Sequence, residues 1–220
     1  MKKLIKGIVD FREKRLPDWR ETFARLALGQ SPDSLFIGCS DSRVVPNVFA
    51  STEPGDLFVV RNVGNLIPPC GSRGLSVSDE SEAAAIEFAL MNLKVSHVIV
   101  CGHSECGAMQ AICGGRAKVE APHLRSWLRH GQPSMESIRN GAPMCPELAP
   151  HNQLSQYNVL QQVEHLKTYP FIRERVDSGQ LRLWGMWFDI QNADVYFFEE
   201  SAGKFVLIDR EECERILSRI

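Results

Sequence analysis

Residues 95–101 read Val-Ser-His-Val-Ile-Val-Cys, and residues 35–38 read Leu-Phe-Ile-Gly immediately before Cys39. Both are short apolar runs of the kind that forms buried β-strands. Further strands are predicted at residues 56–60, 181–189 and near 194–198. Because helical patterns separate most of these runs, the sequence favours an α/β fold with a largely parallel central sheet flanked by helices. Ligands of such sheets bind at the carboxyl ends of the strands.

The segments between the strands predict helices. Residues 2–15 place apolar side chains on one side and Lys and Arg on the other, which predicts an amphipathic N-terminal helical arm. Residues 66–80 are rich in Gly, Ser and Pro and are expected to form a loop. No internal repeat or linker interrupts the chain, so residues 1–220 are expected to form a single domain. The other predicted helices lie at 18–28, 81–93, 105–114, 121–130, 152–178 and 210–219.

Composition excludes several classes of protein. The 220 residues carry a net charge of −2, which gives no reason to expect nucleic acid or an anionic membrane surface as a partner. No apolar run approaches the roughly 18–20 residues of a membrane-spanning helix. Lys6 and Asp10 interrupt any apolar region at the N-terminus, so a secretory signal is not expected. The expected location is the cytoplasm.

The seven cysteines are many for a cytoplasmic protein of this length. An odd number without a secretion signal argues against a disulfide framework and leaves metal binding or catalysis for some of them. Most are expected to be small buried side chains. Cys101 in particular is expected to be a buried thiol.

Cys39 and the segment His103-Ser104-Glu105-Cys106 each follow a predicted strand. His and Cys are preferred zinc ligands, and three protein ligands leave the fourth position open, as a catalytic zinc requires. A lone His-x-x-Cys pattern is weak evidence, and packing of all three side chains in the core is the alternative. The remaining histidines show no ligand spacing.

Three longer motifs strengthen the metal interpretation. Cys-Ser-Asp-Ser-Arg at 39–43, Glu-Pro-Gly-Asp-Leu-Phe-Val-Val-Arg-Asn-Val-Gly-Asn at 53–65 and Cys-Gly-His-Ser-Glu-Cys-Gly-Ala-Met at 101–109 together resemble the β-class carbonic anhydrases, in particular their plant-like branch. The resemblance implies one Zn²⁺ per chain, bound by Cys39, His103 and Cys106. It also implies that Asp41 is a conditional fourth ligand and that Arg43 is the ion-pair partner of Asp41.

The reaction that this resemblance implies is the reversible hydration of CO2 to bicarbonate by attack of a zinc-bound hydroxide. Zinc lowers the pKa of its water enough to make hydroxide available near neutrality. Two anionic thiolates weaken that effect, so an alkaline working range is expected. Asp41, held by Arg43, is expected to accept a hydrogen bond from the hydroxide and so to direct its attack.

A small uncharged substrate calls for a mostly apolar pocket with one or two polar anchors. By resemblance, Gln30, Phe58, Val63 and Gly107 occupy substrate-pocket positions. Phe88 and Asn92 replace a tyrosine and a histidine of the plant-like branch, which puts a proton relay there in doubt. The loop at 70–80 is longer than usual, and its role is not predicted.

The resemblance further implies a homodimer or a dimer of dimers, with the N-terminal helices embracing the partner. From the net charge, neither nucleic acid nor a membrane is expected as a partner. The alternative for the 2–15 helix is to lie on a membrane surface. Some members of the family bind inhibitory bicarbonate at a second site, where this chain has Arg61 but replaces a tryptophan and a tyrosine by Phe36 and Phe188. Phenylalanine offers no hydrogen-bond donor, so that regulation is expected to be absent.

The role of one residue and two alternative functions remain open. Glu105 lies between two expected ligands and either lowers the acidity of the bound water through its charge or points to solvent. The same cysteines also suit a non-catalytic zinc or redox-sensing module. A different zinc hydrolase is the third possibility, although no His-Glu-x-x-His pattern occurs.

Overall fold

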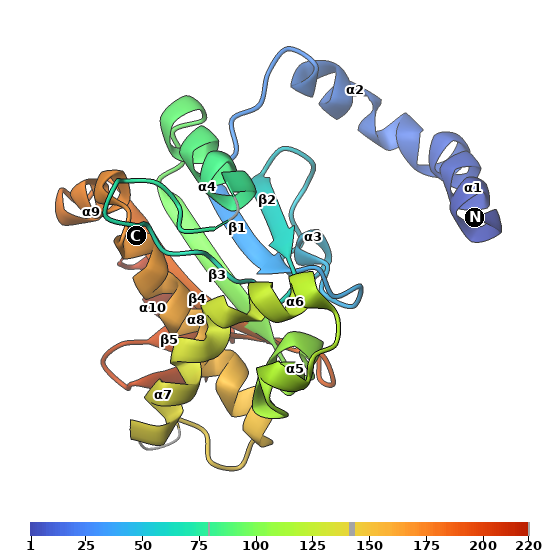
Figure 1. Ribbon diagram of the computed structural model, residues 1–220. Helices are drawn as coiled ribbons and strands as arrows, with labels where there is room; N and C mark the ends of the chain where they lie inside the picture. Colours follow the sequence, from blue (N-terminus) through green and yellow to red (C-terminus); the bar gives the residue numbers. More distant parts are fainter. Residues whose placement is uncertain (79, 141–143, 220) are drawn as a thin grey trace.

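One mixed sheet forms the centre of the computed structural model, which describes residues 1–78, 80–140 and 144–219 (Figure 1). The six strands lie in the order β2-β1-β3-β4-β5-β6. The first four strands of this order are parallel, and β5 and β6 extend the sheet antiparallel. The strands are β1 (Ser34–Cys39), β2 (Leu57–Asn62), β3 (His97–His103), β4 (Arg182–Asp189), β5 (Asp194–Glu199) and β6 (Lys204–Leu207). The expected α/β fold with a largely parallel sheet is therefore confirmed.

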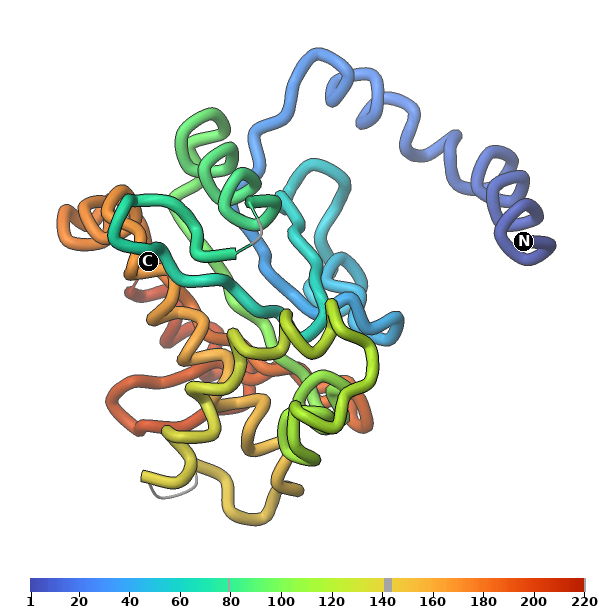
Figure 2. The backbone as a smooth tube through the Cα atoms, viewed as in Figure 1, coloured from blue at the N-terminus to red at the C-terminus, as the bar shows by residue number. Residues whose placement is uncertain are grey.

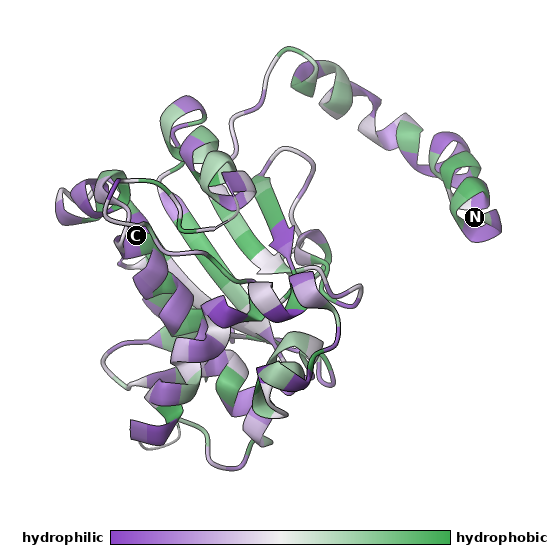
Figure 3. Ribbon diagram, viewed as in Figure 1, coloured by the Kyte–Doolittle hydropathy of each residue, from purple (hydrophilic) through white to green (hydrophobic). Residues whose placement is uncertain are grey.

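Helices pack on the sheet and bury its apolar residues. In Figure 3, β1, β2 and β3 are largely hydrophobic, whereas the helices carry both hydrophobic and hydrophilic residues. The longest, α8, contacts β3 and β4 and also packs against α5, α7 and α9. The helices that follow β1 in the chain are α3 (Pro46–Phe49), α4 (Glu80–Glu87), α5 (Gly107–Cys113), α6 (Pro122–Trp127), α7 (Gln132–Asn140), α8 (Pro150–Lys167), α9 (Pro170–Asp177) and α10 (Arg210–Leu217).

The N-terminal arm projects away from the sheet, as Figure 2 shows most clearly. It runs through α1 (Lys2–Asp10), a π-helical turn at Phe11–Arg15 and α2 (Leu16–Leu26) as one helical stretch, without the break that was expected near residues 16–17. Neither α1 nor α2 has a buried residue. Most apolar side chains of the arm are exposed, while Leu16, Trp19 and Leu26 are half-buried. Among the described residues, no helix is both long enough and apolar enough to span a bilayer.

Several predicted boundaries were wrong for identifiable reasons. The expected helix at 152–178 is two helices, α8 and α9, because Pro170 lacks an N–H and Tyr169 before it is extended. The helix expected from residue 105 begins at Gly107, because Glu105 has a positive φ and Cys106 is extended. Neither α7 nor β6 was predicted. In the 66–80 loop, Asp79 lies outside the described residues.

The strand expected at 95–101 forms two residues later, as β3. It pairs over its whole length with β4, so that His103 lies opposite Phe188. His103 is therefore the last residue of β3, as Cys39 is of β1, rather than the residue of a following turn.

Helix α8 approaches the sheet closely where β3 and β4 carry glycines. A Cβ atom on Gly102 would lie 2.7 Å from Val159 Cγ2, 3.0 Å from Ser155 Oγ and 3.2 Å from the carbonyl oxygen of Ser155. At Gly185 a Cβ atom would lie 3.1 Å from Val159 Cγ1. The absence of side chains at these two positions lets α8 lie directly against the strand end that carries His103.

We expect Gly102→Ala to lower the free energy of unfolding by about 1–3 kcal/mol, because the added methyl group forces α8 away from β3. Urea denaturation followed by circular dichroism measures this change. Gly7→Ala is the control, since no heavy atom of the described residues lies within 4 Å of a Cβ atom at that position in α1. That variant should be as stable as the parent or slightly more so. Equal midpoints for Gly102→Ala and the parent would contradict the close approach.

Candidate metal centre

The side chains of Cys39, His103 and Cys106 meet at the carboxyl edge of the sheet. Cys39 ends β1 and His103 ends β3, and these two strands are parallel neighbours with Gly38 opposite Cys101. Cys106 immediately precedes α5. One ligand atom from each of the three residues lies within 4.8 Å of the other two, and all three residues are buried. This arrangement fits a single metal ion with thiolate and imidazole ligands.

The hydrogen bonding of His103 defines which ring nitrogen faces the centre. Its Nδ1 lies 2.8 Å from the carbonyl oxygen of Ser104. A carbonyl oxygen only accepts, so Nδ1 carries the proton and Nε2 carries the free lone pair. Among the described residues, no group bonds to this Nε2 atom, although it is fully buried. A buried nitrogen without a partner is unfavourable unless a cation binds it, and histidine ligands are typically oriented by such a bond on the other nitrogen.

The two cysteine side chains of the cluster are hydrogen-bonded to each other, with Cys106 as the donor and Cys39 as the acceptor. The Cys106 thiol bonds to Cys39 and holds the pKa of Cys39 below its ordinary value, while the same bond, together with burial, raises the pKa of Cys106. The backbone N–H of Gly64 also lies 3.3 Å from Cys39 Sγ. Cys101 is different, since burial raises its pKa to about 12 and keeps it a neutral thiol, in agreement with its expected role.

Asp41 and Arg43 form the expected ion pair in a bidentate geometry. Arg43 Nε lies 2.9 Å from Asp41 Oδ1, and its second terminal nitrogen lies 2.7 Å from Oδ2. The backbone N–H of Arg43 adds a third bond to Oδ1 at 3.0 Å. These bonds hold the pKa of Asp41 well below its ordinary value, so the carboxylate stays ionised at any pH near neutrality.

Arg61 on β2 holds the backbone of the same turn. Its Nε donates to the carbonyl oxygen of Cys39 at 3.0 Å, and a terminal nitrogen donates to the carbonyl oxygen of Asp41 at 2.7 Å. The sequence did not predict this contact, because Arg61 lies about twenty residues from the turn and reaches it only through the parallel pairing of β1 and β2. Arg61 therefore fixes the path of the chain that carries both a ligand and the carboxylate.

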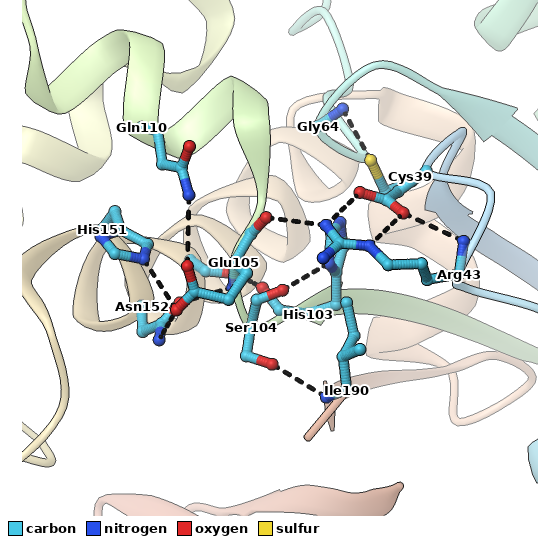
Figure 4. A network of polar contacts seen from close by, with 12 residues as sticks. Cys39, Arg43, Gly64, His103, Ser104, Glu105, Gln110, His151, Asn152 and Ile190 are labelled. Atoms are coloured by element: carbon cyan, nitrogen blue, oxygen red, sulfur yellow. Dashed lines mark hydrogen bonds and ion pairs between the residues drawn. The ribbon is translucent and has the colours of Figure 1, made fainter. Parts of the chain in front are cut away.

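The carboxylate of Glu105 turns towards α8. It bonds to His151 and Asn152 at 3.0 Å each and to Gln110 at 3.3 Å, as Figure 4 shows. The bonds from His151 and Asn152 hold the pKa of Glu105 below its ordinary value. Half of this side chain is exposed, but its carboxylate is held by these three side chains, so the expectation of a carboxylate that simply points to solvent is only partly met.

The four residues expected to contact substrate fall into two groups. Val63 adjoins Gly64, and Gly107 follows Cys106, so both lie beside the metal ligands. Val63 and Ser40 also line a hollow of about 590 Å³. Gln30 and Phe58 lie elsewhere.

Gln30 precedes β1, and Phe58 pairs with Leu35 near the start of that strand. Leu35 is separated from Cys39 by about 13 Å of strand, at roughly 3.3 Å per residue. Phe58 instead packs on Phe88, with ring centroids 5.7 Å apart. Within one chain, Gln30 and Phe58 therefore do not line the same pocket as the metal ligands.

Comparisons with known proteins agree with this geometry. A sequence profile of the family described as carbonic anhydrase matches residues 34–195. A carbonic anhydrase of Synechococcus elongatus is 37% identical over 214 residues, covering 97% of this chain and 76% of that protein. A carbonic anhydrase of Pseudomonas aeruginosa is 35% identical over 206 residues, covering 94% of this chain and 91% of that protein.

Solved structures give the same result. The β-carbonic anhydrase CcaA superimposes with a TM-score of 0.85 at 36% identity, covering 94% of this chain and 98% of that one. A structure described among two tetrameric β-carbonic anhydrases of Sordaria macrospora gives a TM-score of 0.72 at 29% identity, with 89% and 95% covered.

We expect Cys39→Ser, His103→Ala and Cys106→Ser each to lose most bound zinc, because three protein ligands are the fewest that hold a catalytic ion. Metal analysis of the purified variants measures the loss. Cys113→Ser is the matched control, since Cys113 is exposed on α5 and should leave the zinc content at one per chain. Stoichiometric zinc in Cys106→Ser would disprove this ligand set.

Proposed function

This chain belongs to the β-carbonic anhydrase family, and from that premise we propose that it hydrates CO2 reversibly to bicarbonate with one zinc ion bound by Cys39, His103 and Cys106. The observation that carries the proposal is the buried Nε2 of His103, which has no partner in the described part of the chain and lies in a cluster with two thiols. When bound there, zinc supplies a water of lowered pKa as the source of the nucleophile. The residues 1–220 are proposed to form one catalytic domain.

Asp41 and Arg43 are proposed to orient the attacking water. The carboxylate is fixed by three bonds from Arg43 and remains ionised, so it acts as a hydrogen-bond acceptor at every working pH. Because Arg43 engages both carboxylate oxygens, Asp41 is held away from the fourth ligand position. We therefore propose that Asp41 becomes a ligand only when this ion pair is broken.

The substrate pocket is proposed to include residues of two chains. Val63 and the backbone N–H of Gly107 lie beside the metal ligands, whereas Gln30 and Phe58 lie at the other end of β1. They reach a metal centre only if a second copy supplies them. The exposed apolar side chains of the N-terminal arm support a homodimer in which the arm packs on the partner, and a dimer of such dimers is compatible with this arrangement.

A cytoplasmic location is proposed as well. All seven cysteines are free thiols in the structure, including Cys70, Cys113 and Cys213 outside the metal cluster. Unpaired thiols are typical of a reducing compartment.

We expect the zinc-loaded protein to hydrate CO2 with a kcat/KM that rises with pH and has its midpoint above about 7, the value for zinc held by neutral ligands. Two anionic thiolates reduce the effective charge of the metal, and Asp41 does not titrate in this range.

Asp41→Asn should retain zinc but lose about a hundredfold or more in kcat/KM. Stopped-flow assays between pH 6 and 9 measure both, with the exposed Asp33→Asn as control. A zinc-loaded parent without hydration activity would refute the proposed function.

Regulation by bicarbonate at a second site is proposed to be absent. Phe36, Phe49 and Phe188 pack together where an anion would need donors, with ring centroids 6.1 Å apart for the first pair and 4.7 Å for the second. Phe36 and Phe188 are buried, and none of the three rings carries a polar hydrogen. Arg61 is already bonded to two carbonyl oxygens of the Cys39 turn.

Bicarbonate should accordingly inhibit CO2 hydration hyperbolically, as a product, with a Hill coefficient of about one. Inhibition curves at pH 8 test this expectation. A crystal structure at the same pH should show Asp41 paired with Arg43. Sigmoidal inhibition, or a structure with Asp41 on the metal, would contradict it.

A further inference from the structure

The turn between His103 and Cys106 has an unusual backbone conformation. Glu105, in its centre, has φ 56°, in the left-handed region that residues other than glycine rarely adopt. Such a conformation persists only where surrounding contacts enforce it. The direction of this one peptide sets how far the His103 ring lies from the Cys106 thiol.

Asn152 on α8 bonds to Glu105 through both ends of its side-chain amide. Its Oδ1 accepts from the backbone N–H of Glu105 at 2.7 Å, and its Nδ2 donates to Glu105 Oε1 at 3.0 Å. Asn152 is itself buried, with 7% of its surface exposed. From the other side, Arg43 donates to the carbonyl oxygen of Glu105 at 3.0 Å. Figure 4 shows the Glu105 turn held between these two residues.

Ser155, three residues after Asn152 and on the same face of α8, holds the preceding part of the turn. Its hydroxyl donates to the carbonyl oxygen of His103 at 2.8 Å and accepts from Trp187 Nε1 at 3.1 Å. Since Gly102 lets α8 lie against this strand end, the helix bonds to the backbone on both sides of Ser104. The position of α8 therefore determines the path of the ligand turn.

We propose that Asn152 is a positioning residue for the metal centre, which holds Glu105 in the left-handed conformation and so fixes the distance between the ligands His103 and Cys106. The inference rests on the proposed zinc site. Without the two bonds from Asn152, the Glu105 peptide relaxes towards the ordinary regions, and the two ligand atoms no longer converge. Partners of this kind, one shell beyond the metal, typically alter metal affinity 10- to 100-fold.

The test compares Asn152→Ala with His151→Ala. Both remove one partner of the Glu105 carboxylate, but only Asn152 also holds its backbone. Asn152→Ala should release zinc to a chelator at least tenfold faster than the parent and should alter the visible spectrum of the Co²⁺-substituted protein. His151→Ala should stay within threefold of the parent and keep its spectrum. Circular dichroism confirms that each variant is folded.

A reciprocal exchange tests the same contact without removing side-chain volume. Asn152→Asp places a second carboxylate against that of Glu105 and should speed zinc loss. In the double variant Glu105→Gln/Asn152→Asp, the donor and acceptor exchange places, while the aspartate still accepts from the backbone N–H. This variant should recover the zinc retention and the Co²⁺ spectrum of the parent. The pair decides the question even if Asn152→Ala does not fold.

Parent-like zinc release and an unchanged Co²⁺ spectrum in Asn152→Ala would overturn the inference, as would equal losses in Asn152→Ala and His151→Ala. The inference would also be overturned if the double variant did not recover the zinc retention that Asn152→Asp loses. If the parent itself retains no zinc, the proposed metal centre fails instead. The two failures are thereby distinguished.

Discussion

The parallel pairing of β1 with β3 is the constraint on which the site depends. Parallel neighbours end at the same edge of a sheet, so the last residues of the two strands, Cys39 and His103, come together although 64 positions separate them in the chain. The short turn between the end of β3 and the start of α5 then brings Cys106 to the same cluster. A slip of one residue in this register would turn one ligand to the opposite face of the sheet and open the cluster.

Backbone carbonyls and N–H groups at this edge are satisfied by side chains from distant elements. Arg61 binds the Cys39 turn from β2, Arg43 joins that turn to Glu105, and α8 binds the other ligand turn. These bonds matter because the strands end here and no further ladder bonds are available to the chain. The candidate metal centre is thus surrounded by hydrogen bonds that protein groups alone supply.

The same frame explains an anomaly in α8, whose buried positions are largely polar. Asn158 and Gln162 join Asn152 and Ser155 on the buried side, and each bonds to the loop after β2 or to its neighbours. Buried amides of this kind are costly unless paired, and here nearly all are. An apolar helix would pack as well but would leave the loop and the ligand turns without partners.

Much of this protein was determined by the sequence alone. Apolar runs predicted every described strand except β6, because burial on both faces requires them. The candidate metal centre was predicted from the resemblance of the motifs around Cys39, His103 and Cys106 to a known family, since zinc favours those ligand types but their spacing alone is weak evidence. Only the tertiary structure decided what lies around the ligands. The left-handed Glu105, the contacts of Asn152 and Arg61, and the separation of Gln30 and Phe58 from the metal depend on which segments lie side by side. These segments are far apart in the chain. The contacts arise when α8 packs against β3 and when β2 pairs with β1, and local sequence patterns carry no information about such contacts.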